Sequence, residues 1–392
     1  MIINLIGQES SSDSGNISGD SNITSADVMH DKIAYNSADE QIIGTAPFEY
    51  LGTEDDIDNY RVLEDEMYVL LPNNEKKLLK SGHIVAEDDW VQLTLSTSAY
   101  WRSVCYGNNK FVIIAYASNI SFYSEDGINW TKTYLPRSSS TVNDSWSSVC
   151  YGNGKFVAVT ENSSSFSAYS EDGITWTNSV IPSSSFSSVC YGNNKFVSVA
   201  GYSSSGTANI DVAAYSEDGI NWTQTTLPAK CPWKSVCYGN NKYVAIPYRS
   251  SYAAYSTDGI TWTQTTLPAS TYWYSVCYGN GKFVAVAYNT NIAAYSEDGV
   301  NWTQMTMPTS TYWSSVCYGN GKFVAVAGAD YNRNISAYSI DGVNWTQTSL
   351  PASAYWRSIC YGDGKFVTVP YNSKIIAYKN DYEFDGLMLF DC

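Results

Sequence analysis

The sequence has few basic residues, few histidines and no long apolar run. Its 392 residues include 22 Lys and Arg against 38 Asp and Glu, giving a formal net charge of −16. Such an acidic surface repels phosphate backbones and anionic bilayers, so we expect no nucleic-acid partner. No stretch of 18 apolar residues is present, and the opening MIINLIGQESSS lacks the basic start of an export signal. We therefore expect a soluble protein without membrane insertion.

Helical spacing of apolar residues is also absent, and a repeat takes its place. Each unit has four short runs rich in Val, Tyr, Phe, Trp and Thr, separated by Gly, Asn, Asp, Ser and Pro. Four strands at a period near 40 predict an all-β protein, either a propeller or an open solenoid. Seven copies of S-V-C-Y-G or S-I-C-Y-G mark the units, with cysteines at Cys105, Cys150, Cys190, Cys237, Cys277, Cys317 and Cys360.

The seventh unit lacks its fourth strand, and this gap favours a propeller. The other units carry a tryptophan four residues after a turn aspartate, but the chain after Asp381 has none. Trp90 lies 15 residues before Cys105, the spacing that elsewhere links the fourth-strand tryptophan to the next cysteine. If Asp89 to Leu95 pairs with the last unit, an otherwise unpaired edge is satisfied. We therefore predict a seven-bladed β-propeller over residues 87–381, closed by an N-terminal strand, with a C-terminal tail at 382–392.

A turn motif, mostly S-E-D-G, recurs before the fourth strand. Aspartate accepts hydrogen bonds from nearby backbone N–H groups, glycine permits the turn and tryptophan packs onto the sheet. One carboxylate per turn offers too few oxygens for calcium, so we predict no metal and no cofactor. The motif resembles a shortened Asp-box of sialidase-like (BNR-type) propellers over roughly residues 88 to 381. The turn aspartates are Asp126, Asp172, Asp218, Asp258, Asp298 and Asp341.

The cysteines are predicted to be free. Seven share one strand position, and neighbouring blades do not bring that position within the roughly 7 Å that a disulfide needs. We expect small, buried, reduced side chains. Cys231 and Cys392 lie outside the pattern, and neither is assigned a role.

Comparison of the repeats with one another indicates which face carries function. The turns between strands one and two and the S-x-D-G turns hardly vary, whereas the loops between strands two and three and the links between units vary in length. Loops on a rigid scaffold can change without refolding the core, so this variable face is the candidate site. Its aromatic rings suit sugar faces, and its arginines suit an acidic glycan. The predicted ligand-binding residues are Tyr100, Trp101, Arg102, Tyr116, Tyr248, Arg249, Tyr288, Tyr331, Arg333, Tyr355, Trp356, Arg357 and Tyr371.

Two structural readings compete with this interpretation. Trp101 and its equivalents, replaced once by Phe186, can pack between blades instead of touching a ligand. Surface arginines can simply be solvated.

Catalysis is not expected. The resemblance to sialidases implies three arginines around a carboxylate, a tyrosine with a neighbouring glutamate as nucleophile, and an aspartate as acid. The carboxylates of the variable face fall in loops of different units, the R-I-P signature is missing, and both histidines, His30 and His83, precede the repeats. We therefore predict a non-catalytic propeller with no catalytic residue, and a glycoside hydrolase stays the alternative. The carboxylates concerned are Asp144, Glu161, Asp211 and Asp330.

Residues 1–86 are predicted to form an acidic, β-rich adaptor. Residues 1–89 hold 19 acidic and 5 basic side chains, and residues 1–24 have the composition of a flexible segment. Ala26 to Pro47 resembles a short module of bacteriophage tail proteins through Asp27-Val28, Lys32, Ala34-Tyr35 and Ile43-Gly44-Thr45. A solvated acidic linker is the alternative.

The resemblance implies a receptor-binding protein of a virion tail, made in the bacterial host cytoplasm. Its expected partners are tail or baseplate proteins and a host cell-surface polysaccharide or glycoprotein. A small module that buries little surface is often completed by copies of itself, so a homo-oligomer is also considered. A purely structural tail or baseplate subunit is the competing interpretation.

Overall fold

The computed structural model describes residues 32–35, 41–44, 59–63, 66–70, 76–80, 90–139, 144–162, 165–201, 210–328, 333–381 and 388–391. All regular elements in these ranges are β-strands, paired antiparallel. No described helix is long and apolar enough to cross a membrane. Two compact units are present: a terminal unit (residues 1–87 and 382–392) and a repeat unit (residues 88–381). The segment 1–24, expected to be flexible, lies outside the described residues, as do Tyr331, Asp330 and Cys392.

The terminal unit is built from both ends of the chain. β1 (Lys32–Tyr35) pairs with β2 (Gln41–Gly44). A separate sheet has the strand order β3 (Asn59–Leu63), β4 (Glu66–Leu70), β5 (Lys76–Lys80) and β32 (Met388–Asp391). The interpretation of residues 382–392 as a tail of their own is corrected here, because backbone pairing with β5 places β32 in this sheet.

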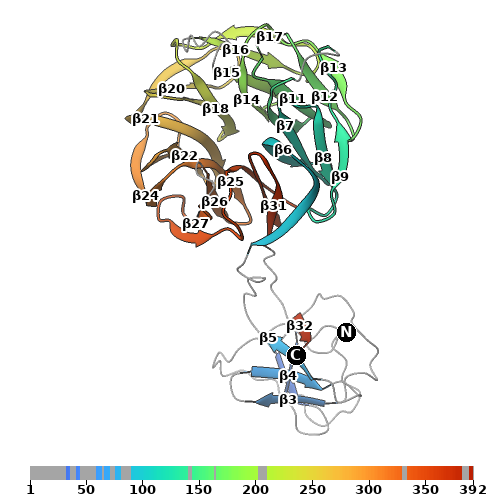
Figure 1. Cartoon of the computed structure of the whole chain (residues 1–392). Helices are drawn as coiled ribbons and strands as arrows, with labels where there is room; N and C mark the ends of the chain where they lie inside the picture. The colour runs from blue at the N-terminus through green and yellow to red at the C-terminus, as the bar shows by residue number, and fades with distance from the viewer. Residues whose placement is uncertain are drawn as a thin grey trace. The chain divides into compact units, whose positions relative to one another are not determined.

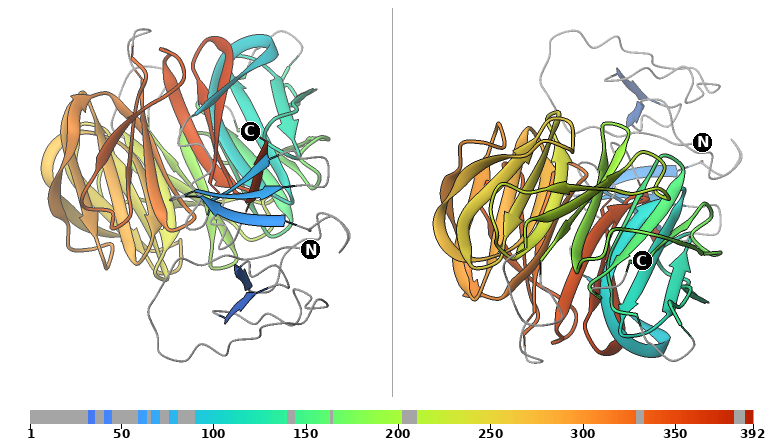
Figure 2. Two further views of the ribbon diagram at one scale, coloured as in Figure 1. Left: turned by 90° about the horizontal axis from the view of Figure 1, so that it is seen from below. Right: turned by 90° about the horizontal axis from the view of Figure 1, so that it is seen from above.

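The repeat unit contains seven consecutive sets of strands, which Figure 1 shows arranged around a common centre. Edge-on views show the strands running from one face of this arrangement to the other (Figure 2). The first strands are β6 (Val91–Gly107, from Tyr100 on), β10 (Trp146–Gly152), β14 (Phe186–Gly192), β18 (Trp233–Gly239), β21 (Thr263–Gly279, from Tyr272 on), β25 (Trp313–Gly319) and β29 (Trp356–Gly362). The second strands are β7 (Lys110–Tyr116), β11 (Lys155–Thr160), β15 (Lys195–Ala200), β19 (Lys242–Pro247), β22 (Lys282–Tyr288), β26 (Lys322–Ala327) and β30 (Lys365–Pro370).

The third strands are β8 (Ile120–Ser124), β12 (Ser167–Ser170), β16 (Val212–Ser216), β20 (Ser250–Ser256), β23 (Thr290–Ser296), β27 (Ile335–Ser339) and β31 (Ser373–Asn380). The fourth strands are β9 (Thr131–Tyr134), β13 (Thr177–Ser179), β17 (Thr223–Thr226), β24 (Thr303–Thr311), β28 (Thr346–Ser349) and the first parts of β21 and β6. Within the repeat unit, three sheets have four strands, and two have seven because β21 and β6 each run from one repeat into the next.

The segment after Trp90 supplies the strand that the last repeat lacks. Residues of β6 pair with β31 in the register Leu93 to Ile376 and Val91 to Tyr378. Trp90 is only 6% exposed and packs with Trp356. This is the pairing that the spacing between Trp90 and Cys105 predicts.

Two sets of contacts join each first strand to the next. A serine two residues after the buried aromatic accepts a hydrogen bond from the backbone N–H of the neighbouring strand, at 3.1–3.2 Å. The seventh of these bonds runs from Val104 N–H to Ser358 Oγ and links the first repeat to the last. The glycine of each C-Y-G motif lies against the tyrosine of the next repeat, and Gly362 likewise lies against Tyr106. The apolar core sits between adjacent sheets, as where Val112 of β7 packs with Trp146 and Phe156 of the following repeat.

The S-x-D-G turns have the structural role that the sequence predicts. Asp126 Oδ1 accepts hydrogen bonds from the backbone N–H of Ile128 and Asn129, at 2.8 and 2.7 Å, and Ser124 Oγ accepts one from Gly127 N–H. The same bonds recur in the other five turns. Asn108, in the turn after β6, donates to Glu171 O at 3.2 Å, so both kinds of invariant turn share one end of the repeat unit.

The turn carboxylates make the fold sensitive to acid. Burial alone would raise the pKa of Asp218, but hydrogen bonds from the backbone of Asn221 and Ile220 outweigh it and lower the pKa to about 2. Because this value lies below that of an unfolded aspartate, the stabilisation is present above about pH 4 and is lost as the pH falls through 2. We expect Asp218→Asn to lose less stability than the wild type between pH 4 and 2, measured by urea unfolding. Glu217→Gln, a neighbouring exposed acid, should keep the wild-type slope, and identical slopes for Asp218→Asn and wild type would refute the prediction.

Candidate functional site

A β-bulge at the start of each first strand positions the candidate site. The pairing with the second strand shifts register between a buried aromatic residue and the serine two positions later, which leaves one extra residue between them. A bulge of this kind redirects the side chain of the extra residue. In the seven repeats this residue is Arg102, Ser147, Ser187, Lys234, Tyr274, Ser314 and Arg357.

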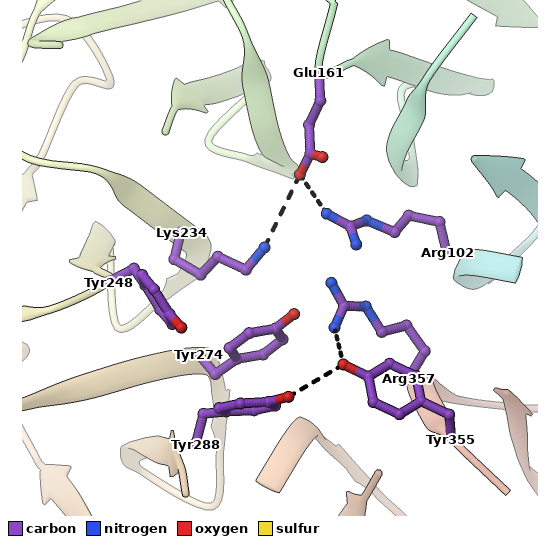
Figure 3. A pocket seen from close by; sticks show the side chains of 8 residues that line it. All are labelled: Arg102, Glu161, Lys234, Tyr248, Tyr274, Tyr288, Tyr355 and Arg357. Carbon is purple, nitrogen blue, oxygen red and sulfur yellow. Dashed lines mark hydrogen bonds and ion pairs between the residues drawn. The ribbon is translucent and has the colours of Figure 1, made fainter. Parts of the chain in front are cut away.

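The four large bulge residues converge on one pocket (Figure 3). It has a volume of about 350 Å³. The three bulge serines do not contribute: Ser147 Oγ, for example, donates to backbone carbonyls of its own and the next repeat, Val159 O and Phe186 O. The pocket is therefore asymmetric, because only four of the seven bulge residues contribute side chains to it. Its lining consists of Arg102, Glu161, Lys234, Tyr248, Tyr274, Tyr288, Tyr355 and Arg357.

The remaining lining residues also come from repeated positions. Glu161 and Tyr248 directly follow their second strands, and Tyr288 ends its own. A backbone hydrogen bond fixes the end of each second strand against its own first strand. The acceptor is the residue just before the buried aromatic of the same repeat: Glu161 N–H donates to Ser145 O at 2.8 Å, and Tyr248 N–H donates to Pro232 O at 2.7 Å. Glu161 thus occupies the position that tyrosine holds in several other repeats.

One carboxylate and three cations share the pocket. Arg102 Nη2 lies 2.5 Å from Glu161 Oε1, and Lys234 Nζ lies 4.0 Å from the same oxygen. Burial would raise the pKa of Glu161, but Arg102 and Lys234 outweigh it, so its pKa is lowered and it is ionised at neutral pH. Arg357 Nη1 contacts Tyr355 Oη at 3.4 Å, and within the described ranges no carboxylate lies within 4.0 Å of its guanidinium. Arg357 is therefore the cation that is most available to a ligand.

The tyrosines bring the cations close together. Lys234 Nζ and Arg357 Cζ lie 4.7 and 4.9 Å from the centroid of the Tyr274 ring. Burial and the nearby guanidinium groups lower the pKa of Lys234. Burial would raise the pKa of Tyr274, but Arg357 and Lys234 outweigh it and lower the pKa. Three cations beside one carboxylate concentrate positive charge in a chain whose net charge is −16, which favours an anionic ligand.

Five of the predicted ligand-binding residues line the pocket, namely Arg102, Tyr248, Tyr288, Tyr355 and Arg357. Four others lie in or beside a chain of ring contacts that passes through it, namely Tyr100, Tyr116, Arg249 and Tyr371. Arg333 contacts Thr311 Oγ1 at 3.2 Å and is not part of the lining.

Trp101 and Trp356, which are also among the predicted ligand-binding residues, do not line the pocket. Both are fully buried, and their indole N–H groups donate to Ser373 O and Ala352 O. The alternative reading, in which these aromatics pack between repeats, describes them correctly.

Lys234 and Tyr274 are not among the residues predicted from the sequence, and Glu161 is there only as one of four carboxylates that a hydrolase could use. Comparison of the repeats nevertheless contains a signal for the bulge residues that line the pocket. The residue after the buried aromatic is serine in three repeats and large or charged in four. A strand position that tolerates both serine and arginine does not face a packed core.

The repeat cysteines differ from expectation in their burial. All eight described cysteines are free, as predicted, but only Cys231 is buried, and the seven repeat cysteines are partly exposed. Burial of the sulfur atoms, together with the thiols of neighbouring repeats, raises the pKa of Cys105, Cys150, Cys237 and Cys317. They are protonated thiols and not reactive thiolates.

Fold and site together define a β-propeller with a polar pocket at one end. Solved structures with a similar fold include virginiamycin B lyase from Staphylococcus aureus, with a TM-score of 0.63 and 13% identity over 75% of this chain and 99% of that one. A catalytically inactive histidine-to-alanine variant of that lyase, solved with quinupristin, matches equally well, with a TM-score of 0.63 and 13% identity over 74% of this chain and 99% of that one. YCF48 bound to D1 peptide matches with a TM-score of 0.59 and 15% identity over 76% of this chain and 96% of that one.

These similarities concern the fold alone, because the identities are low. No protein-family model and no curated protein matches the sequence. The resemblances to sialidase-like propellers and to phage tail proteins therefore remain predictions.

Proposed function

We propose that this chain is the receptor-binding protein of a phage or phage-like tail, and that its repeat unit binds an acidic host-surface glycan without cleaving it. The observation that carries the proposal is the pocket itself: three cations against one carboxylate, bordered by tyrosines. Arg357 and Lys234 are placed to bind an anionic group, since Arg102 is already paired with Glu161. Tyrosine rings offer flat apolar faces with a polar edge, which suit sugar rings.

We further propose that the repeats form a closed seven-bladed propeller with Asp-box turns. Support comes from the seven serine hydrogen bonds between first strands, the last of which returns from Val104 to Ser358, and from the pairing of β31 with β6. Closure matters for function because the pocket draws on the first and last repeats, through Arg102 and Arg357, as well as on those between.

The terminal unit is proposed to dock onto tail or baseplate proteins. Its organisation as a compact unit of its own and the sequence resemblance of Ala26 to Pro47 support this role. The competing function is a structural tail subunit whose variable loops contact other virion proteins. A concentrated cationic pocket favours a small anionic ligand over a broad protein contact.

Glycoside hydrolysis is a second candidate because one observation favours it. The pocket brings Tyr274, with its lowered pKa, together with Glu161 and three cations, the kind of set that the sialidase resemblance implies. Its described lining includes no aspartate that could act as the acid. Asp144 is fully buried and accepts hydrogen bonds from Ser138. The histidine chemistry suggested by the inactive lyase variant has no counterpart in residues 90–381, where the sequence has no histidine.

Glu161→Gln separates binding from hydrolysis. Removing the carboxylate frees Arg102 and adds one positive charge to the pocket, so we expect affinity for an acidic glycan to rise roughly tenfold. A hydrolase that relies on Glu161 would instead lose turnover. The measurement is titration calorimetry with the acidic glycan, together with an assay of released reducing sugar, on wild type and variant.

The direct test of the proposed function is a glycan array probed with the full-length protein. We expect binding to acidic members and not to their neutral counterparts, with no release of sugar. Glu171→Gln, which changes an exposed acid at the other end of the repeat unit, is the matched control and should bind as the wild type does. Binding to no acidic glycan, or release of sugar from any of them, would refute the proposal.

A further inference from the structure

We infer that the pocket is one subsite of a longer groove-like site and that the ligand is an acidic oligosaccharide of several sugar units lying along an arc of tyrosines. The inference rests on the proposed function and specifies its substrate class. The tyrosine arc consists of Tyr272, Tyr248, Tyr274, Tyr288, Tyr355, Tyr371 and Tyr100.

The arc is continuous through the pocket wall. Tyr274 stacks on Tyr288 with a centroid distance of 5.1 Å and an interplanar angle of 23°. The hydroxyl groups of Tyr288 and Tyr355 are 3.2 Å apart, and Tyr355 also contacts Arg357. The rings next to the cations are therefore held in place by one another before any ligand binds.

The arc leaves the pocket in two directions. On one side Tyr355 contacts Tyr371 at 5.6 Å between centroids, and Tyr371 contacts Tyr100 at 4.7 Å. Tyr100 is 41% exposed, which is unusual for a side chain of this size and leaves much of its ring available.

On the other side Tyr248 leads to Tyr272, with centroids 5.1 Å apart. The exposed guanidinium of Arg249 lies 5.1 Å from the Tyr272 ring and 5.4 Å from the Tyr248 ring. This direction thus ends in a fourth cation, Arg249, outside the pocket, where a further acidic group can bind.

The size and the asymmetry of the site favour an extended ligand over a single small sugar. A volume of about 350 Å³ is near the lower end for small-molecule sites, about 300–1,000 Å³. The arc continues beyond this volume in both directions, whereas the bulge positions of the second and third repeats have only Ser147 and Ser187. An oligosaccharide can contact the pocket cations, the tyrosine arc and Arg249 together. One acidic sugar unit would lie in the pocket, the flanking units on tyrosine faces, and a second acidic unit near Arg249.

The test measures affinity against chain length with full-length protein. Three acidic series are used, oligogalacturonates, oligosialic acids and heparin-derived oligosaccharides of one to six units, with maltooligosaccharides as neutral controls. In the series that binds best we expect the Kd to fall roughly tenfold or more between the shortest member that binds and the hexamer. Tyr100→Ala and Arg249→Gln should each remove part of this gain and leave the Kd of the shortest member unchanged. Tyr134→Ala, which truncates another exposed tyrosine on β9, should change neither value.

The possible failures are distinguishable. If short and long members bind equally, or if Tyr100→Ala and Arg249→Gln keep the full gain, the longer site is refuted while the proposed function stands. If no acidic sugar of any length binds, both are refuted. An equal gain with length for oligoglutamate peptides would overturn the choice of a sugar chain as the occupant.

Discussion

Replacing Gly152 with alanine is expected to destabilise the repeat unit by roughly 3 kcal/mol or more. A Cβ at this position would lie 2.0 Å from Cγ of Tyr191, deep inside van der Waals contact. Tyr191 cannot move away easily because its ring also packs on Phe196 at 4.7 Å. The added methyl group would therefore push apart the first strands of two adjacent repeats, which the serine hydrogen bonds hold together.

Gly154→Ala, two residues further on, is the matched control. Gly154 has a φ of +74°, but a Cβ there would meet no atom within 4 Å. We expect a cost of about 1 kcal/mol from backbone strain alone. Urea unfolding of both variants measures the difference, and equal destabilisation would mean that the contact between glycine and the next repeat's tyrosine does not stabilise the junction.

Arg357→Gln is expected to weaken binding of an acidic glycan roughly 10- to 100-fold, the effect of losing charge-assisted hydrogen bonds. Arg357 pairs with no carboxylate in the described part of the chain, so the change strands no buried charge and the unfolding midpoint should stay close to that of the wild type. Titration calorimetry and thermal unfolding are the two measurements.

Arg333→Gln provides the comparison, because Arg333 contacts Thr311 away from the pocket lining. We expect it to bind the glycan as the wild type does. Equal affinities for wild type and Arg357→Gln would show that the ligand is held elsewhere, whereas equal losses in both variants would point to long-range charge and not to the pocket.

The strand pairing and the turn chemistry could be read from the sequence because both depend on local spacing. The distance from Trp90 to Cys105 matches that of complete repeats, and an aspartate followed by glycine specifies its own hydrogen bonds. The spacing of the repeats was enough to place Arg102 and Arg357 near each other, because the pairing of β6 with β31 makes the first and last repeats adjacent.

The details of the site depend on the bulge, which alternation along a strand does not reveal. Regular alternation would give Trp101 and its neighbours fixed inner and outer faces, but the extra residue shifts the register and sends Arg102, Lys234, Tyr274 and Arg357 into the pocket. Because of the register shift, the tryptophan before the bulge is buried while the bulge residue faces the pocket. The shift also reverses the face of the sheet on which residues later in the strand are expected to lie. The repeat cysteines are accordingly partly exposed and pack at the margin of the core clusters, as Cys105 does.

Glu161 illustrates a second limit. The sequence does not show which cations will lie beside a carboxylate in one of the loops. The distance of 2.5 Å between Glu161 and Arg102 depends on how the sheets of two adjacent repeats pack. The same holds for the tyrosine arc, whose members come from several repeats and meet only in the folded chain.

A crystal structure of the full-length protein with the best-binding acidic oligosaccharide tests the central claim most directly. The account predicts an anionic group of the ligand within about 2.7–3.2 Å of Arg357 and Lys234, with adjoining sugar faces on Tyr274, Tyr288 or Tyr355. Two results would contradict the account. One is a ligand bound at the end of the repeat unit that carries the S-x-D-G turns, and the other is a ligand in the pocket whose anionic group contacts neither Arg357 nor Lys234.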